Sequence, residues 1–145
     1  MIKNYTSEVP AAKSIAHIEH RLVEHGANNI LKIYEEKRLA GISFTVTVSG
    51  SDIPFRLPAR IDRVGKRLLS TVKKMHKGTE QRILEQAERT GWKLLSDWVD
   101  IQMSLIELDQ VELMEVFMPY IYNHKKEQSL FEQMKSIGFM LEDKR

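Results

Sequence analysis

The sequence predicts an α+β fold formed by a single domain, residues 1–145. Three patterns lead to this prediction. Apolar residues recur at helical spacing near the N-terminus, alternate with polar residues between positions 42 and 57, and return to helical spacing afterwards. The expected architecture is an N-terminal helix and a three-stranded antiparallel meander, followed by a mainly helical C-terminal part. A chain of this length buries roughly 70% of its unfolded surface, which is enough for one core.

The first helix is expected between Pro10 and Gly26. Proline is tolerated in the first turn of a helix, and glycine commonly follows the last turn. Between them, Ile15, Ile18 and Leu22 lie at helical spacing and should form one buried stripe.

Three strands are expected after this helix, and the first of them, residues 30–35, has the weakest pattern. Gly50-Ser51 is a tight-turn pair that joins the second strand to the third. Pro54 cannot donate a hydrogen bond to a sheet, so the third strand should lie at an edge. The residues expected on the buried face, which a helix must cover, are Ile42, Phe44, Val46, Val48, Ile53, Phe55 and Leu57.

A helix is expected over residues 60–77, because apolar residues recur there every three or four positions and Gly78 can end it. Thr79 is a suitable N-cap for a long helix that reaches about Leu108, with a weak point at Gly91.

Two further helices are predicted from capping-box spacing. Asp109 with Glu112 begins a short helix that Pro119 should bend. Ser129 with Glu132 begins the last helix.

The long helix has apolar residues over about 220° of its circumference, whereas a surface helix needs only about 100°. It is therefore either the central helix of the core or the interface of a homo-oligomer formed through residues 80–108. Met103, Met114 and Met118 are expected to fill gaps in the core.

Composition limits the classes of protein that the chain can belong to. There is no cysteine, which excludes disulfides, thiol catalysis and thiolate zinc sites. The N-terminus lacks the apolar region of a signal peptide, and no apolar run reaches the length of a membrane span. A soluble, cytoplasmic protein with no membrane partner is expected.

Charge is distributed unevenly along the chain, although the net charge is only +2. Residues 56–77 carry eight cations and one acid, Asp62, whereas residues 78–118 carry three cations and nine acids. A basic block therefore precedes an acidic one.

On a helical wheel, seven cations of residues 60–77 share the side opposite the apolar stripe. Such a face, with so few acids, is typical of a surface that contacts phosphates. The candidate nucleic-acid-binding residues are these seven and their flanking arginines: Arg56, Arg60, Arg63, Lys66, Arg67, Lys73, Lys74, Lys77 and Arg82.

Two other interpretations of the basic block remain open. Its cations could pair with acids of the same fold or of another subunit, or they could simply be solvated. The acids of the long helix form no matching stripe, which weakens internal pairing. No aromatic residue lies among the cations, so bases would have to stack elsewhere, for example on Tyr34, Phe44, Phe55 or Trp92.

Candidate catalytic and metal-binding residues are few. His17, His20 and Glu24 share one face of the first helix and could bind zinc, but that face is the solvated one. The sequence has no nucleophile elbow, no G-x-G-x-x-G motif and no Walker motif. We expect a protein that is not an enzyme and that has no metal or cofactor.

Three segments resemble a group of small uncharacterised proteins encoded by phages and prophages: "SEVPAAKSIAHIEHRLVEHGA", "ISFTVTVSGSDIPFRLPARI" and "QAERTGWKLLSDWVDIQMSLIELDQVELMEVFMPYI". The resemblance covers most of the chain, includes no functional motif and implies a viral accessory role.

The sequence therefore favours a non-catalytic, phage-type accessory protein that binds DNA or RNA. The alternative is an oligomeric host-takeover or anti-defence protein whose basic face docks on an acidic protein partner.

Overall fold

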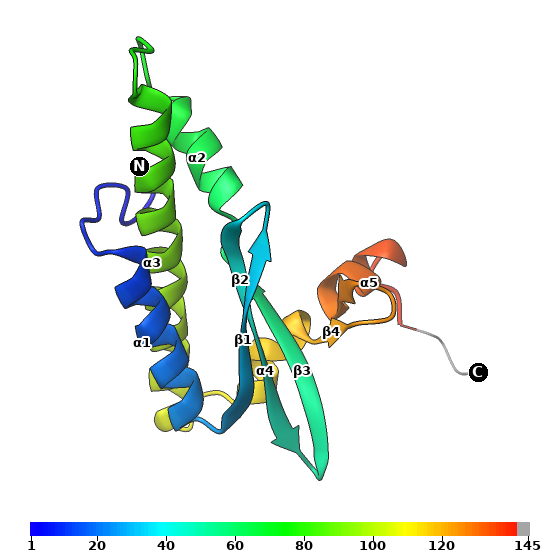
Figure 1. Cartoon of the computed structure of the whole chain (residues 1–145). Coiled ribbons are helices and arrows are strands. Elements are labelled where there is room, and N and C mark those ends of the chain that lie inside the picture. Colours follow the sequence, from blue (N-terminus) through cyan, green and yellow to red (C-terminus); the bar gives the residue numbers. More distant parts are fainter. Residues whose placement is uncertain (142–145) are drawn as a thin grey trace.

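The computed structural model describes residues 1–141, and the predicted α+β fold is confirmed (Figure 1). An N-terminal helix and a three-stranded sheet precede a mainly helical C-terminal part. The elements in chain order are α1 (Ala11–Glu24), β1 (Ala27–Glu35), β2 (Arg38–Val48), β3 (Ser51–Pro58), α2 (Ile61–Leu69), α3 (Thr79–Glu107), α4 (Leu113–Phe117), the 3₁₀ helix η1 (Met118–Tyr120), β4 (Tyr122–Asn123), β5 (Gln128–Ser129) and α5 (Leu130–Ser136).

The sheet is the predicted antiparallel meander, with strand order β1-β2-β3. Its second turn lies one position earlier than predicted. Val48 pairs with Ser51, so Ser49 and Gly50 are the two central residues, and both have positive φ. Such a turn matches the right-handed twist of the strands that it joins. Pro54 lies on β3 at the sheet edge, as predicted.

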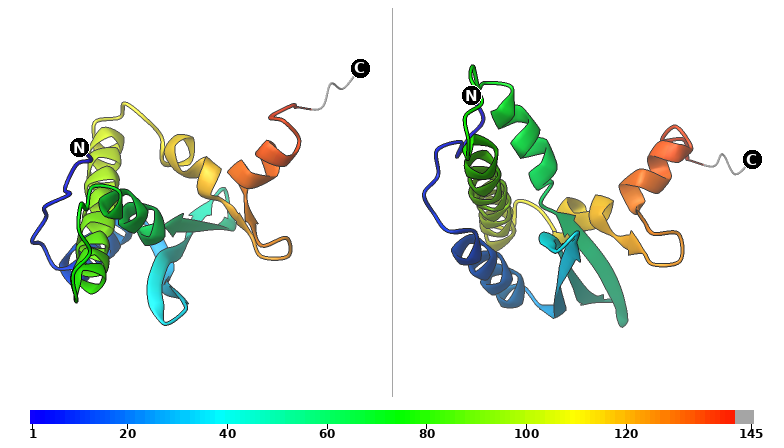
Figure 2. Two further views of the ribbon diagram at one scale, coloured as in Figure 1. Left: turned by 90° about the horizontal axis from the view of Figure 1, so that it is seen from above. Right: turned by 45° about the horizontal axis from the view of Figure 1, so that its top comes forward.

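The core lies between the sheet and two helices that run side by side, α1 and α3 (Figures 1 and 2). Phe44 and Phe55 stack with ring centroids 5.2 Å apart, and Phe117 of α4 meets both rings edge-on. The predicted stripe of the first helix is buried in this core. The buried side chains contributed by α1 and α3 include Ile15, Ile18, Leu22, Trp92, Val99 and Met103.

The long helix is the central helix of the core, and this explains its wide apolar surface. α1 covers one side of α3 and α2 covers another, while the N-terminal residues 1–10 are also attached to it. Gly91 does not interrupt α3. Met103 is buried and Met114 packs against the core, but Met118 is 45% exposed, so the prediction that it fills a core gap was wrong.

The helix predicted over residues 60–77 is shorter than expected, because α2 ends at Leu69. The hydroxyl groups of Ser70 and Thr71 donate hydrogen bonds to the carbonyl oxygens of Arg67 and Leu68. These bonds occupy carbonyl groups that a continuing helix would use. The residues that follow form a loop, with Gly78 in the left-handed conformation as the N-cap of α3.

The C-terminal part contains both predicted short helices. The capping box of α4 is formed by Glu112 and Glu115, three residues later than predicted, and Asp109 has a left-handed conformation before the helix begins. Pro119 lies in η1, where the helix tightens after α4. The Ser129–Glu132 capping box of α5 is present as predicted.

Helix α5 projects from the rest of the molecule next to the small β4-β5 hairpin (Figures 1 and 2). Two of its apolar side chains, Phe131 and Ile137, are exposed. Within residues 1–141, no helix combines the length and the apolar character needed to cross a membrane.

Candidate nucleic-acid interface

Helix α2, the loop after it and the start of α3 form an antiparallel helical hairpin, with the loop at one end of the molecule (Figures 1 and 2). The two helices approach closely because each has a glycine at the contact, Gly91 on α3 and Gly65 on α2. A Cβ atom on Gly91 would lie only 2.5 Å from Cδ1 of Ile61, and a Cβ atom on Gly65 would lie 3.7 Å from Cβ of Ala87. We call residues 60–82 the basic hairpin.

The basic hairpin carries eight cations and two acids. Half of its cations belong to α2 or its N-cap. These are exposed, because the apolar side of α2 faces α3. The N-cap residue, Arg60, has φ 52° and ψ 47°, a left-handed conformation that few non-glycine residues adopt. The four cations of this group are Arg60, Arg63, Lys66 and Arg67.

Three further predicted residues, Lys73, Lys74 and Lys77, lie in the exposed loop rather than on the helix. The prediction that seven cations share one helical face was therefore wrong, since α2 ends before these lysines. Arg82, on the first turns of α3, is also exposed. The hairpin thus presents its cations on a short helix, a loop and the start of a second helix.

Arg56 is separate from the other predicted residues. It is half-buried on β3, where its guanidinium lies 4.9 Å from the ring centre of Tyr122 and donates a 3.0 Å hydrogen bond to the hydroxyl of that tyrosine. Its other terminal nitrogen lies 3.4 Å from a carboxylate oxygen of Glu35. Arg56 therefore already has partners within the fold.

The eight cations of the basic hairpin differ from Arg56 in this respect. Within residues 1–141, none of them forms an ion pair with a carboxylate at 4.0 Å or less. In this part of the chain, the positive charge of the hairpin is not neutralised by direct contacts.

Four of the six acidic residues of α3, all of them beyond its first two turns, form ion pairs. Arg21 of α1 lies 2.9 Å from Asp100 and 2.9 Å from Glu107. Arg38 of β2 pairs with Glu88. These contacts attach α1 and the sheet to α3, so the carboxylates that form them are not available to the basic hairpin.

Asp97 is also engaged away from the hairpin. Burial raises the pKa of its carboxyl, but the hydrogen bond from Asn4, the hydrogen bond and charge of Lys93, and the charge of Lys3 together hold the pKa below its ordinary value. The amide nitrogen of Asn4 lies 2.8 Å and the ammonium of Lys93 lies 2.9 Å from the carboxylate. This carboxylate anchors the N-terminal residues to α3.

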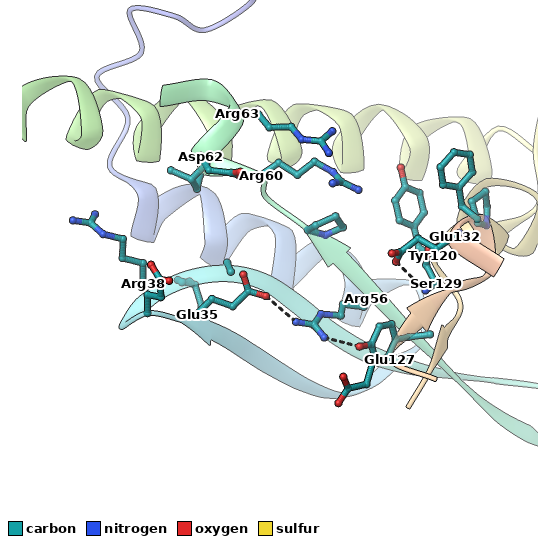
Figure 3. Close-up of a pocket in the computed structure, with 18 of the residues that line it drawn as sticks. Glu35, Arg38, Arg56, Arg60, Asp62, Arg63, Tyr120, Glu127, Ser129 and Glu132 are labelled. Atoms are coloured by element: carbon teal, nitrogen blue, oxygen red, sulfur yellow. Dashed lines mark hydrogen bonds and ion pairs between the residues drawn. The ribbon is translucent and has the colours of Figure 1, made fainter. Parts of the chain in front are cut away.

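A broad, open groove of about 1230 Å³ begins at the base of the basic hairpin and extends over the sheet edge to the C-terminal segment (Figure 3). Arg60 and Arg63 point into it from α2, and Tyr120 and Glu132 lie on the opposite side. Four arginines and five carboxylates line this groove, so its charge is mixed.

The groove contains aromatic residues that the sequence pattern did not indicate. Phe44, Phe55 and Trp92, which were possible stacking surfaces, are buried in the core. Tyr120, Tyr122 and Phe131 line the groove instead. Tyr120 lies in η1, Tyr122 in β4 and Phe131 in α5. Only the tertiary arrangement makes these elements line the same groove as α2, and no local sequence pattern encodes it.

The histidines of α1 pair with acids. His17 lies 3.2 Å from Asp100, and His20 lies 2.9 Å from Glu24. Within the described part of the chain, no three histidine, aspartate or glutamate side chains lie together in a way that could hold a metal ion.

Comparison with protein-family models gave no match, and comparisons with curated proteins and with solved structures gave no significant match.

Proposed function

We propose that this protein is a non-catalytic, cytoplasmic accessory protein of phage type that binds nucleic acid through the basic hairpin. One observation supports the proposal most. Eight exposed cations lie within 23 residues of chain, residues 60–82, and none of them has a carboxylate partner within residues 1–141.

The physical reason is electrostatic. Like charges on neighbouring turns, such as Arg63 and Arg67, destabilise an isolated helix by a few tenths of a kcal/mol per pair. A phosphate backbone would remove this repulsion and release its condensed counterions. Such contacts fix the position of the strand and do not distinguish base sequences.

A charge-reversal experiment tests the proposal. Arg67→Glu with Lys74→Glu changes two exposed side chains that hold no ion pair in the described chain. At about 0.05 M salt, the loss of two phosphate contacts should lower the binding constant for an oligonucleotide roughly 100-fold, as measured by mobility shift. The melting temperature should stay nearly unchanged.

Lys125→Glu with Lys126→Glu is the matched control. These lysines are exposed in the turn between β4 and β5, away from the tip of the basic hairpin (Figure 1), and the substitution changes the net charge by the same amount. Equal losses of binding in both variants would indicate a nonspecific effect of net charge and would contradict a role for the hairpin.

The alternative, an interaction protein that docks on an acidic host protein or forms oligomers, is favoured by the exposed apolar side chains of α5. Light scattering measures the oligomeric state directly. A protein that binds neither DNA nor RNA at low salt would support this alternative over nucleic-acid binding.

A further inference from the structure

We infer that the nucleic acid bound by this protein is single-stranded, and that the groove beside α2 takes its bases while the basic hairpin holds its phosphates. This inference rests on the proposed function and names the class of nucleic acid. It is drawn from the position, charge and aromatic lining of the groove.

The groove continues directly from the basic hairpin. Arg60 and Arg63 belong to the hairpin and also line the groove, and both guanidinium groups point into it (Figure 3). Within residues 1–141, neither arginine has a carboxylate partner. A strand whose phosphates lie along α2 therefore has its bases next to the groove.

The charge of the groove selects bases over phosphates. Five carboxylates and four arginines line it, so a phosphate beyond the α2 side would meet carboxylates such as Glu35, Glu127 and Glu132. These carboxylates repel phosphate but accept hydrogen bonds from the exocyclic amino groups of bases. Only the side formed by Arg60 and Arg63 is suited to phosphate.

The aromatic side chains supply surfaces for stacking. Phe131 of α5 is 49% exposed and lines the groove, together with the partly exposed ring of Tyr120. Base stacking on aromatic side chains tolerates any base sequence. In a duplex the base faces are stacked on one another, so they would not reach these rings. The groove therefore favours a single strand.

An abasic oligonucleotide tests the inference, because it has the same phosphates and no bases. The wild-type protein should bind an oligodeoxycytidylate of about 12 nucleotides, whose bases have an exocyclic amino group, at least about tenfold more tightly than an abasic strand of equal length, as measured by fluorescence anisotropy. The matching duplex should also bind more weakly than the single strand.

Phe131→Ala should remove most of the preference for the strand with bases and leave the affinity for the abasic strand unchanged. Ile137→Ala is the matched control, because Ile137 is 55% exposed at the end of the same helix and does not line the groove. Circular dichroism checks that α5 is intact in both variants. Arg63→Gln should lower the affinity for both strands by the same factor, because it removes a contact with a phosphate and both strands have the same phosphates.

The outcomes separate the two proposals. If the wild type binds both strands equally, or if Phe131→Ala keeps the preference for the strand with bases, then bases do not enter the groove as inferred. The basic hairpin would still be a phosphate-binding surface in either case. Binding of neither strand would contradict the proposed function itself.

Discussion

At the scale of single residues, charged side chains in this protein have two distinct roles. Carboxylates of α3 hold neighbouring elements through short contacts, as Asp100 and Glu107 do with Arg21. The cations of the basic hairpin form no ion pair within residues 1–141. A residue such as Arg67 should therefore be replaceable without loss of stability, whereas Asp97 or Arg21 should not.

Asp97 gives a prediction that depends on pH. Its pKa is lower in the folded protein than its ordinary value of 3.8, so the unfolded state binds more protons as the solution becomes acidic. The stabilisation is present above pH 3.8 and is lost as pH falls through the folded pKa. Asp97→Asn should lower the free energy of unfolding by about 1 kcal/mol at pH 7.

Urea denaturation of both proteins at pH 7 and near pH 3 measures this effect. The difference in stability between wild type and Asp97→Asn should shrink at the lower pH. A difference that is equal at both values would contradict the assigned contacts of Asp97 with Asn4 and Lys93.

At the scale of elements, the close packing of α2 on α3 depends on glycine. A Cβ atom at Gly91 would overlap Ile61. It would also lie 3.5 Å from the carbonyl oxygen of Ala59 and 3.6 Å from Val64, so the two methyl groups of Gly91→Val have no free space. This substitution should displace α2 and destabilise the protein by about 2 kcal/mol. Gly65→Ala is the comparison, because its methyl group would make only an ordinary contact with Ala87. It should be neutral or should stabilise by up to about 1 kcal/mol through helix propensity.

Thermal denaturation of the two variants tests this packing. Equal melting temperatures, or a larger loss in Gly65→Ala than in Gly91→Val, would show that α2 does not lie against α3 as described. The same comparison, made with bound oligonucleotide, would report whether the position of α2 affects binding.

Elements with strong local signals could be predicted from the sequence. The alternation from Ile42 to Leu57, the stripe of α1 and the Ser129–Glu132 capping box all correspond to observed elements. The end of α2 could not be predicted from periodicity, because Val72 and Met75 continue the apolar spacing. Hydroxyl groups of Ser70 and Thr71 bond to the backbone and end the helix at Leu69.

The candidate site was predicted in part. The sequence indicated the cations and showed that the acids of the long helix form no matching stripe. In the structure, several of these acids pair instead with Arg21 of α1 and Arg38 of β2. The groove could not be predicted, because it joins residues far apart in the chain. Arg60 and Tyr120 face it from opposite sides, and only the tertiary arrangement brings them there.

At the scale of the whole molecule, the charge asymmetry of the sequence becomes an asymmetry of structure. Most of the acidic block forms the central helix, which is joined by ion pairs to α1 and the sheet. Most of the basic block forms a hairpin at one end of the molecule (Figures 1 and 2). The mixed groove lies where this hairpin meets the sheet and the C-terminal segment.

The salt dependence of binding tests most directly whether the basic hairpin holds phosphates. The logarithm of the binding constant for a single strand, plotted against the logarithm of salt concentration, should fall linearly with a slope of about −0.7 per contact, or between about −3 and −5.5 for four to eight contacts. Arg67→Glu with Lys74→Glu should make the slope less steep by about 1.4. A slope near zero, or one that the double substitution leaves unchanged, would contradict phosphate binding by the hairpin.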